Sequence, residues 1–333
     1  MLHRLAFACT WVLVLGASGS LCAQADRAAP RGLVTAILLE APKTGPTRIE
    51  CSARGVERFD AASGALVDRF DLPTRCFAGV AHSAGYLFAG GEAGKRGVVH
   101  AVDAKGRCIT SLEVADDVVV ALARHRDLLA VASADGSVVL VRCAEDLSTL
   151  RVERRLPSHR GGASAVAFDA AGRFVASGGR DGVVRLHDFA RESLEGTATC
   201  REIASHTAAV LALAFAENGE LYSSSADGAL RVHDSEGRLL RSWLRIARDL
   251  RAMVVLADQV VLAGGDGRLH CVERYREGRR SFTATGSGRA EALCSLVLDV
   301  PSGLAFAGTR DAVLRFDLAA VVGDGGKGGE ARR

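Results

Sequence analysis

Residues 175–188 read VASGGRDGVVRLHD and contain the pattern from which the rest of the chain can be interpreted. Small and branched residues run from Phe174 to Gly178, Arg180-Asp181-Gly182 has the composition of a tight turn, and Val183 to Asp188 alternate with period two. Two short apolar runs joined by a turn of this kind are typical of neighbouring antiparallel strands. The stretch therefore predicts a strand, a glycine turn and a second strand.

The sequence on either side adds two more strands to this unit. Ala163 to Phe168 form an upstream apolar run, and a more polar stretch up to Glu202 has room for a fourth strand. The same order returns in the next unit, at 209–215, 221–225, 230–234 and 239–244. Each unit is therefore predicted to be four antiparallel strands.

The turn recurs along the whole chain at a nearly constant interval. Its central residues are 42, 39, 46, 46, 39 and 45 residues apart, at Gly55, Gly97, Gly136, Gly182, Gly228, Gly267 and Ala312. A repeat of about 43 residues indicates one supersecondary unit that buries its apolar faces against copies of itself. Seven such units would occupy almost the whole chain.

The repeats resemble those of the WD-repeat family. The segment 175–188 is similar to that family's consensus, with His187 where its Trp usually stands, and YSSSADGALRVHD at 222–234 makes the same replacement at His233. The other units keep the turn and strand pattern with weaker motifs. The resemblance implies an all-β fold, a seven-bladed β-propeller of four-stranded antiparallel blades, whose loops present binding surfaces to other proteins.

The resemblance also implies a hydrogen-bond network within each complete unit. It would join a His before the first strand, a Ser on the second strand and the Asp of the turn. These positions hold His159, Ser177, Asp181, His206, Ser223 and Asp227. The same residue types form hydrolase triads, but their recurrence with the repeat favours a structural role.

The two ends of the chain are predicted to lie outside the propeller. Residues 1–25 have a basic start, an apolar run and a small-residue cleavage site, which indicates an export signal; Leu21 before Cys22 makes lipoprotein processing the minority alternative. The propeller would span 26–322, and the Gly-rich segment 323–333 is predicted to be a disordered tail. Two segments, 26–32 and 319–322, compete for the fourth strand of the last blade, which is otherwise incomplete.

Composition and cysteine usage narrow the range of partners. A net charge of +3 is too balanced to indicate nucleic acid or an anionic membrane. Seven cysteines follow the predicted signal. None of them forms a CxxC pattern, which would indicate a zinc site or a redox site. Most lie in apolar strand-like runs, so we expect them to fill the core, with a disulfide between blades as the alternative.

Motifs for chemistry are missing from the sequence. It has no complete phosphate loop, GxSxG, HExxH or EF-hand pattern, and the adjacent His270 and Cys271 fall on opposite faces of a strand. We therefore expect no enzyme activity, no cofactor and no bound metal. The alternatives are an enzyme or redox propeller that uses the central channel, and a binder of small ligands or cell wall.

The predicted turns carry several basic residues at one end of the ring. These are Arg54, Lys95, Arg96, Arg180 and Arg310. Units seven, one and two would be neighbours in a closed ring, so Arg310, Arg54 and Lys95-Arg96 are predicted to form a basic arc for an acidic protein partner. Ordinary solvated turns are the alternative. The resulting prediction is a monomeric, exported scaffold for protein interactions, periplasmic or secreted.

Overall fold

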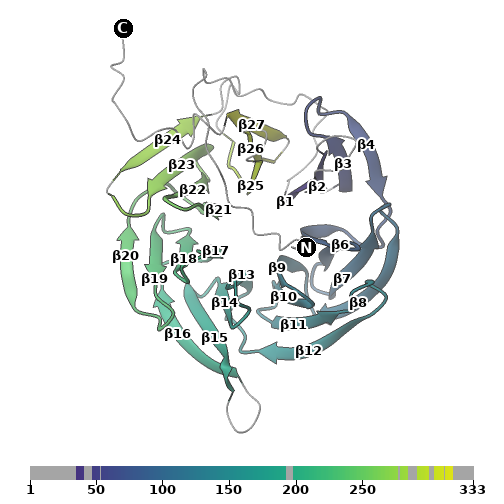
Figure 1. Cartoon of the computed structure of the whole chain (residues 1–333), viewed down its shortest axis with the longest axis horizontal. Helices are drawn as coiled ribbons and strands as arrows, with labels where there is room; N and C mark the ends of the chain where they lie inside the picture. Colours follow the sequence, from purple (N-terminus) through teal and green to yellow (C-terminus); the bar gives the residue numbers. More distant parts are fainter. Residues whose placement is uncertain are drawn as a thin grey trace, which may run out of the picture.

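The computed structural model describes residues 35–40, 47–52, 54–192, 198–276, 278–283, 291–299, 304–310 and 312–317. They form seven antiparallel sheets arranged around a central axis (Figure 1), so the fold is an all-β, seven-bladed propeller. The first strand of each blade lies near the axis and the last lies at the rim. The predicted signal at 1–25, both candidate closing segments and the tail lie outside the described residues.

The first three blades each contain four strands in simple meander order. Blade 1 comprises β1 (Ala36–Glu40), β2 (Thr47–Ser52), β3 (Gly55–Asp60) and β4 (Leu66–Phe70). Blade 2 comprises β5 (Cys76–His82), β6 (Gly85–Glu92), β7 (Arg96–Asp103) and β8 (Cys108–Ala115). Blade 3 comprises β9 (Val119–His125), β10 (Leu128–Ser133), β11 (Val138–Cys143) and β12 (Leu150–Leu156).

The next three blades repeat this meander. Blade 4 comprises β13 (Ala163–Phe168), β14 (Phe174–Gly179), β15 (Val183–Glu192) and β16 (Ala198–Ser205). Blade 5 comprises β17 (Val210–Phe215), β18 (Leu221–Ser225), β19 (Leu230–His233) and β20 (Leu239–Trp243). Blade 6 comprises β21 (Leu250–Val255), β22 (Gln259–Gly264), β23 (Arg268–Glu273) and β24 (Arg279–Thr283).

Blade 7 has three strands among the described residues. They are β25 (Ser295–Asp299), β26 (Leu304–Gly308) and β27 (Val313–Asp317). The blade packs against blade 1, where Phe306 and Val313 meet Ile37 and Ala61 in a shared apolar cluster. Contacts between the blades therefore close the ring.

The hydrophobic core lies between the blades and not within any one of them. Seven separate clusters of buried residues each join two neighbouring blades. Between blades 2 and 3, for example, Leu87 and Val99 pack with Leu129 and Val139. A single four-stranded sheet has two apolar faces, so each blade needs a neighbour on both sides.

The meander gives the ring two different ends. The linker face carries the turns between second and third strands together with the connections from blade to blade. The hairpin face carries the turns between first and second strands and between third and fourth strands. The predicted networks and basic residues belong to the linker face.

The turn glycines on the linker face also fasten neighbouring blades. Gly182 has a left-handed φ of 77°, and its carbonyl accepts a 2.7 Å hydrogen bond from the backbone N–H of His206, which precedes blade 5. A Cβ on Gly182 would lie 2.5 Å from the carbonyl oxygen of His206. Gly228 repeats this arrangement one blade later, with φ 78° and a 2.9 Å bond from Ile246. Glycine is required here by both backbone conformation and close approach.

Candidate partner-binding face

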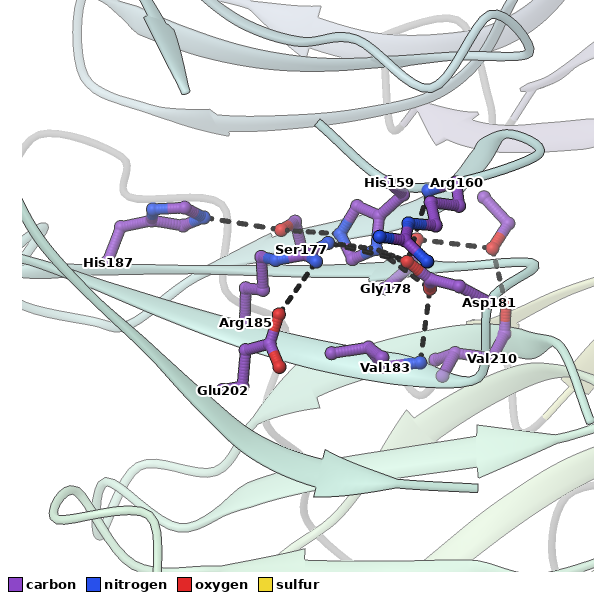
Figure 2. Close-up of polar contacts among 11 residues, drawn as sticks. His159, Arg160, Ser177, Gly178, Asp181, Val183, Arg185, His187, Glu202 and Val210 are labelled. Atoms are coloured by element: carbon purple, nitrogen blue, oxygen red, sulfur yellow. Dashed lines mark hydrogen bonds and ion pairs between the residues drawn. The ribbon is translucent and has the colours of Figure 1, made fainter. Parts of the chain in front are cut away.

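The linker face of blade 4 is organised around the buried ring of His159 (Figure 2). Its Nε2 lies 2.9 Å from Ser177 Oγ, and its Nδ1 lies 3.0 Å from Asp181 Oδ1. The backbone N–H of His159 donates to the carbonyl of Gly136 in blade 3 at 2.9 Å. One residue therefore joins the turn of blade 3 to the turn of blade 4.

Two charged or polar neighbours extend this network. Arg185 NH1 lies 2.8 Å from His159 Nδ1, and Ser177 Oγ lies 3.3 Å from Nε2 of His187. One ring nitrogen cannot donate to Asp181 and accept from Arg185 at the same time. The neutral ring therefore has two hydrogen-bond patterns, with the Ser177 hydroxyl pointing either toward His159 or toward His187.

Burial sets the charge state of this network. It lowers the pKa of His159 below its usual value, although Asp181 acts in the opposite direction. Burial would raise the pKa of Asp181, but hydrogen bonds from His159 and from the Val183 N–H give a net lowering. At pH 7 a neutral imidazole therefore lies beside an ionised carboxylate.

Blade 5 contains the second network with nearly the same geometry. His206 Nε2 lies 2.9 Å from Ser223 Oγ, and Nδ1 lies 3.2 Å from Asp227 Oδ2. Arg231 lies 3.6 Å from the same carboxylate oxygen, as Arg185 does in blade 4 at 3.5 Å. The structure thus brings together the three residues of each predicted set, one set in blade 4 and the other in blade 5.

The burial of these serines bears on the hydrolase interpretation. Ser177 and Ser223 have no exposed surface, and the side chains of His159 and His206 are also fully buried. A nucleophilic hydroxyl must reach a substrate carbonyl, which these two hydroxyls cannot do in this conformation. Their hydrogen bonds instead join loops to turns.

Other blades stabilise the same turn with residues that the sequence analysis did not assign. In blade 6, His270 Nε2 lies 3.0 Å from Asp266 Oδ2, within one turn. In blade 3, the backbone N–H of Asp116 donates to Asp135 at 2.8 Å. In blade 2, His100 lies 2.7 Å from both Thr74 and Ser111. Aligning the third strands would have shown His100 and His270 at the position of Arg185.

The predicted basic residues all lie at turns of the linker face, but on different blades. Arg310, Arg54 and Arg96 belong to the consecutive blades 7, 1 and 2, whereas Arg180 belongs to blade 4 and is separated by blade 3. All are exposed, as is Lys95. We use the term basic arc for Arg310, Arg54, Lys95 and Arg96.

Part of the positive charge of the basic arc is already paired. Lys95 Nζ lies 3.2 Å from Glu92 Oε2, and Arg96 NH2 lies 2.6 Å from Glu92 Oε1. Arg96, followed by Lys95, lowers the pKa of Glu92. Exposed pairs of this kind contribute little stability, so a partner carboxylate can compete with Glu92 for the two cations.

The cysteines are separate side chains in the described part of the chain. Cys51, Cys76, Cys143 and Cys271 are buried, whereas Cys108, Cys200 and Cys294 are half-buried, and none forms a disulfide there. Burial raises the pKa of Cys76 to about 12 and that of Cys143 to about 11. These thiols act as small apolar groups in the core, as expected.

Among the described residues, no group of three or more His, Cys, Asp and Glu side chains is arranged to hold a metal ion. The same residues include no helix with the length and apolar character needed to cross a bilayer.

Comparison with known proteins places the fold in a family. A family model described as "Outer membrane protein assembly factor BamB" matches residues 52–284, from the end of β2 to just beyond β24. No curated protein shows significant similarity to the chain. The match supports a β-propeller family without identifying WD repeats, so that finer resemblance stays a prediction. The chain belongs to the family of the outer membrane protein assembly factor BamB.

Proposed function

We propose that this protein is a non-enzymatic periplasmic scaffold that binds another protein during assembly of outer membrane proteins. The family match over residues 52–284 carries the proposal, since it joins this ring to a family described by an assembly role. The ring offers a broad loop-lined face suited to protein contact. Export and the lack of catalysis are part of the proposal.

The basic arc is the surface that we assign to the partner. Arginine presents a planar fork that matches carboxylates, and the arc extends over three neighbouring blades. Arg310 is exposed and has no side-chain hydrogen bond or ion pair within the described residues. An acidic partner would therefore gain charge complementarity, which increases association rate and specificity.

Affinity purification of the tagged chain from its native cell envelope tests the role. We expect one protein to be recovered in stoichiometric amount, and deletion of the gene to lower the level of folded outer membrane proteins. A variant with Arg54→Glu, Arg96→Glu and Arg310→Glu should lose the partner. Turnover of a substrate without any such partner, or a bound chromophore in the purified protein, would contradict the proposal.

A matched control makes the same change in net charge at the other end of the ring. Arg107→Glu, Arg238→Glu and Arg276→Glu all lie in turns between third and fourth strands on the hairpin face, and all three side chains are exposed. This control should retain the partner. Equal loss in both variants would show that net charge matters and that the basic arc has no special role.

A further inference from the structure

We propose that a pocket on the hairpin face, between blades 2 and 3, binds a small dicarboxylate through a cluster of arginines. The pocket has a volume of about 600 Å³ and is lined by Arg124, Arg126, Arg142 and Arg151, together with His82. It lies at the opposite end of the ring from the basic arc. The proposal therefore adds a second site to the one assigned above.

The pocket includes a residue with an unusual backbone conformation, Arg126. Arg126 has a φ of 54°, in the left-handed region that costs an L-residue about 1 kcal/mol or more. Arg126 is the first of the two residues that join β9 to β10, whereas the longer turns at this end of blades 4 and 5 have glycine in the left-handed region, with Gly172 at 71° and Gly219 at 81°. Strained residues of this kind are enriched at functional sites, because selection retains them for reasons other than stability.

The side chain of Arg126 is also available. It is exposed at the pocket, and within the described residues it makes no side-chain hydrogen bond or ion pair. Glycine would fit this turn with less strain, yet the chain places an unpaired guanidinium here. Within the described residues, no side-chain hydrogen bond or ion pair of this arginine offsets its backbone cost.

The remaining charges leave the pocket positive. Four arginines line it against the carboxylates of Asp127 and Glu145. Asp127 is engaged by Arg142, which also contacts Glu153 Oε2 at 3.1 Å. Arg151 is 70% exposed in its side chain and has a long 3.5 Å contact to the same Glu153. Arg126 and Arg151 are therefore the cations most open to a ligand.

The inner wall of the pocket adds fixed donors. Arg124 NH1 donates to the carbonyl of Ala81 at 3.1 Å, which holds its side chain across from blade 3 to blade 2. His82 Nδ1 accepts from the backbone N–H of Ala84 at 3.1 Å. In the neutral ring the hydrogen is then on Nε2, which leaves one more donor at the pocket.

The size and chemistry of the pocket define the ligand class. A volume of about 600 Å³ is within the range of small-molecule sites. Guanidinium groups bind carboxylates with two parallel hydrogen bonds, and two accessible arginines match a ligand with two carboxylates. A compact dicarboxylate is thus preferred over a monocarboxylate.

Binding of succinate, citrate, acetate and inorganic phosphate to the purified chain tests this site. Titration calorimetry should show millimolar or tighter binding of the di- and tricarboxylates and weaker binding of acetate. Arg126→Gly should weaken succinate binding at least about tenfold, as expected for loss of a charged hydrogen bond. It should also raise the melting temperature without ligand, because it relieves the strained turn.

Arg151→Gln should also weaken succinate binding. The control Arg248→Gln, which removes an exposed arginine from the linker face, should leave succinate binding unchanged. Equal affinity in the wild-type chain and Arg126→Gly would overturn the proposal, as would the absence of any dicarboxylate binding at millimolar concentration. Phosphate binding more tightly than succinate would overturn the assigned ligand class. Loss of partner-protein binding in the basic-arc variant would affect none of these results.

Discussion

Neighbouring blades are joined on one face by a network centred on a guanidinium and on the other by a network centred on a neutral imidazole. Between blades 5 and 6, on the hairpin face, Arg274 is 4% exposed and bonds the Tyr222 hydroxyl at 2.8 Å and Glu220 at 3.0 Å. Between blades 3 and 4, on the linker face, a neutral His159 joins Ser177 and Asp181. Both networks contain a largely buried carboxylate, and they differ in the group at the centre, a guanidinium in one and a neutral imidazole in the other.

The network around Arg274 is complete because each group has a partner. Arg274 also donates to the carbonyls of Leu256 and Ala257 at 2.9 and 2.7 Å, and its guanidinium lies 5.3 Å from the Tyr222 ring centroid. Burial would raise the pKa of Glu220, but hydrogen bonds from Tyr222 and Arg274 bring it to about 2. Removing Arg274 would take a direct cationic partner from Glu220, whereas removing the neutral ring of His159 would leave Asp181 with Arg185 beside it.

The largest expected effect follows from removing the buried cation. Arg274→Met leaves the Glu220 carboxylate with Arg241 as its remaining cationic partner, and we expect a loss of about 3 kcal/mol in the free energy of unfolding. Urea unfolding at pH 7 measures this change. The double variant with Glu220→Gln should recover part of the loss, and an unchanged single variant would contradict the charged description.

A smaller loss is expected when the network around His159 is cut. His159→Ala removes partners from Ser177 and Asp181 and opens space beside Gly179, so stability should fall by about 2 kcal/mol. His206→Ala is the matched variant in blade 5 and should behave alike. A loss larger than that of Arg274→Met would reverse the proposed order of the two networks.

Blade 6 offers a histidine on its third strand that does not join two blades. Within the described residues, the side chain of His270 hydrogen-bonds only Asp266, four residues earlier in the turn that precedes β23. His270→Ala should therefore cost about 1 kcal/mol, less than His159→Ala, in the same unfolding measurement. Equal losses would indicate that the connection between blades adds nothing to the network.

The smallest change at pH 7 is expected at His187, whose titration range differs from that of Glu220 in the other network. Burial lowers the pKa of His187 to about 4 from 6.5, with smaller contributions from His159 and Arg185. The unfolded ring binds its proton first as pH falls, so the stability due to the neutral ring is complete above about pH 6.5 and declines toward pH 4. Glu220 loses its contribution only at lower pH, between its usual value and about 2.

Replacing the buried imidazole tests this assignment. His187→Leu should change stability at pH 7 by less than about 1 kcal/mol, because it removes a buried ring whose Nδ1 has no hydrogen-bond partner. The decline in unfolding free energy between pH 6.5 and 4 should become shallower. An identical pH profile in the variant would show that other groups cause the decline.

Local pattern predicted the strands better than the partners of their side chains. Ala163–Phe168 was predicted and observed with the same bounds, because alternation and turn glycines act within a few residues. The third strand of that blade was predicted to end at Asp188 but extends to Glu192. The polar fourth strand was predicted without exact bounds. Rim strands are exposed on one side, so they have a weaker apolar pattern.

The sequence by itself determined the number of blades, because the turns repeat, and its resemblance to a known repeat family supplied the His-Ser-Asp sets of blades 4 and 5. The turn contacts of blades 2, 3 and 6 do not follow that motif and were not predicted. The tertiary structure alone showed that Arg274 meets Glu220, and that Arg126 shares a pocket with His82 and Arg151. These residues come from different turns and, for the most part, from different blades. Their contacts form only when the sheets pack around the axis, and no local periodicity records a contact of that kind.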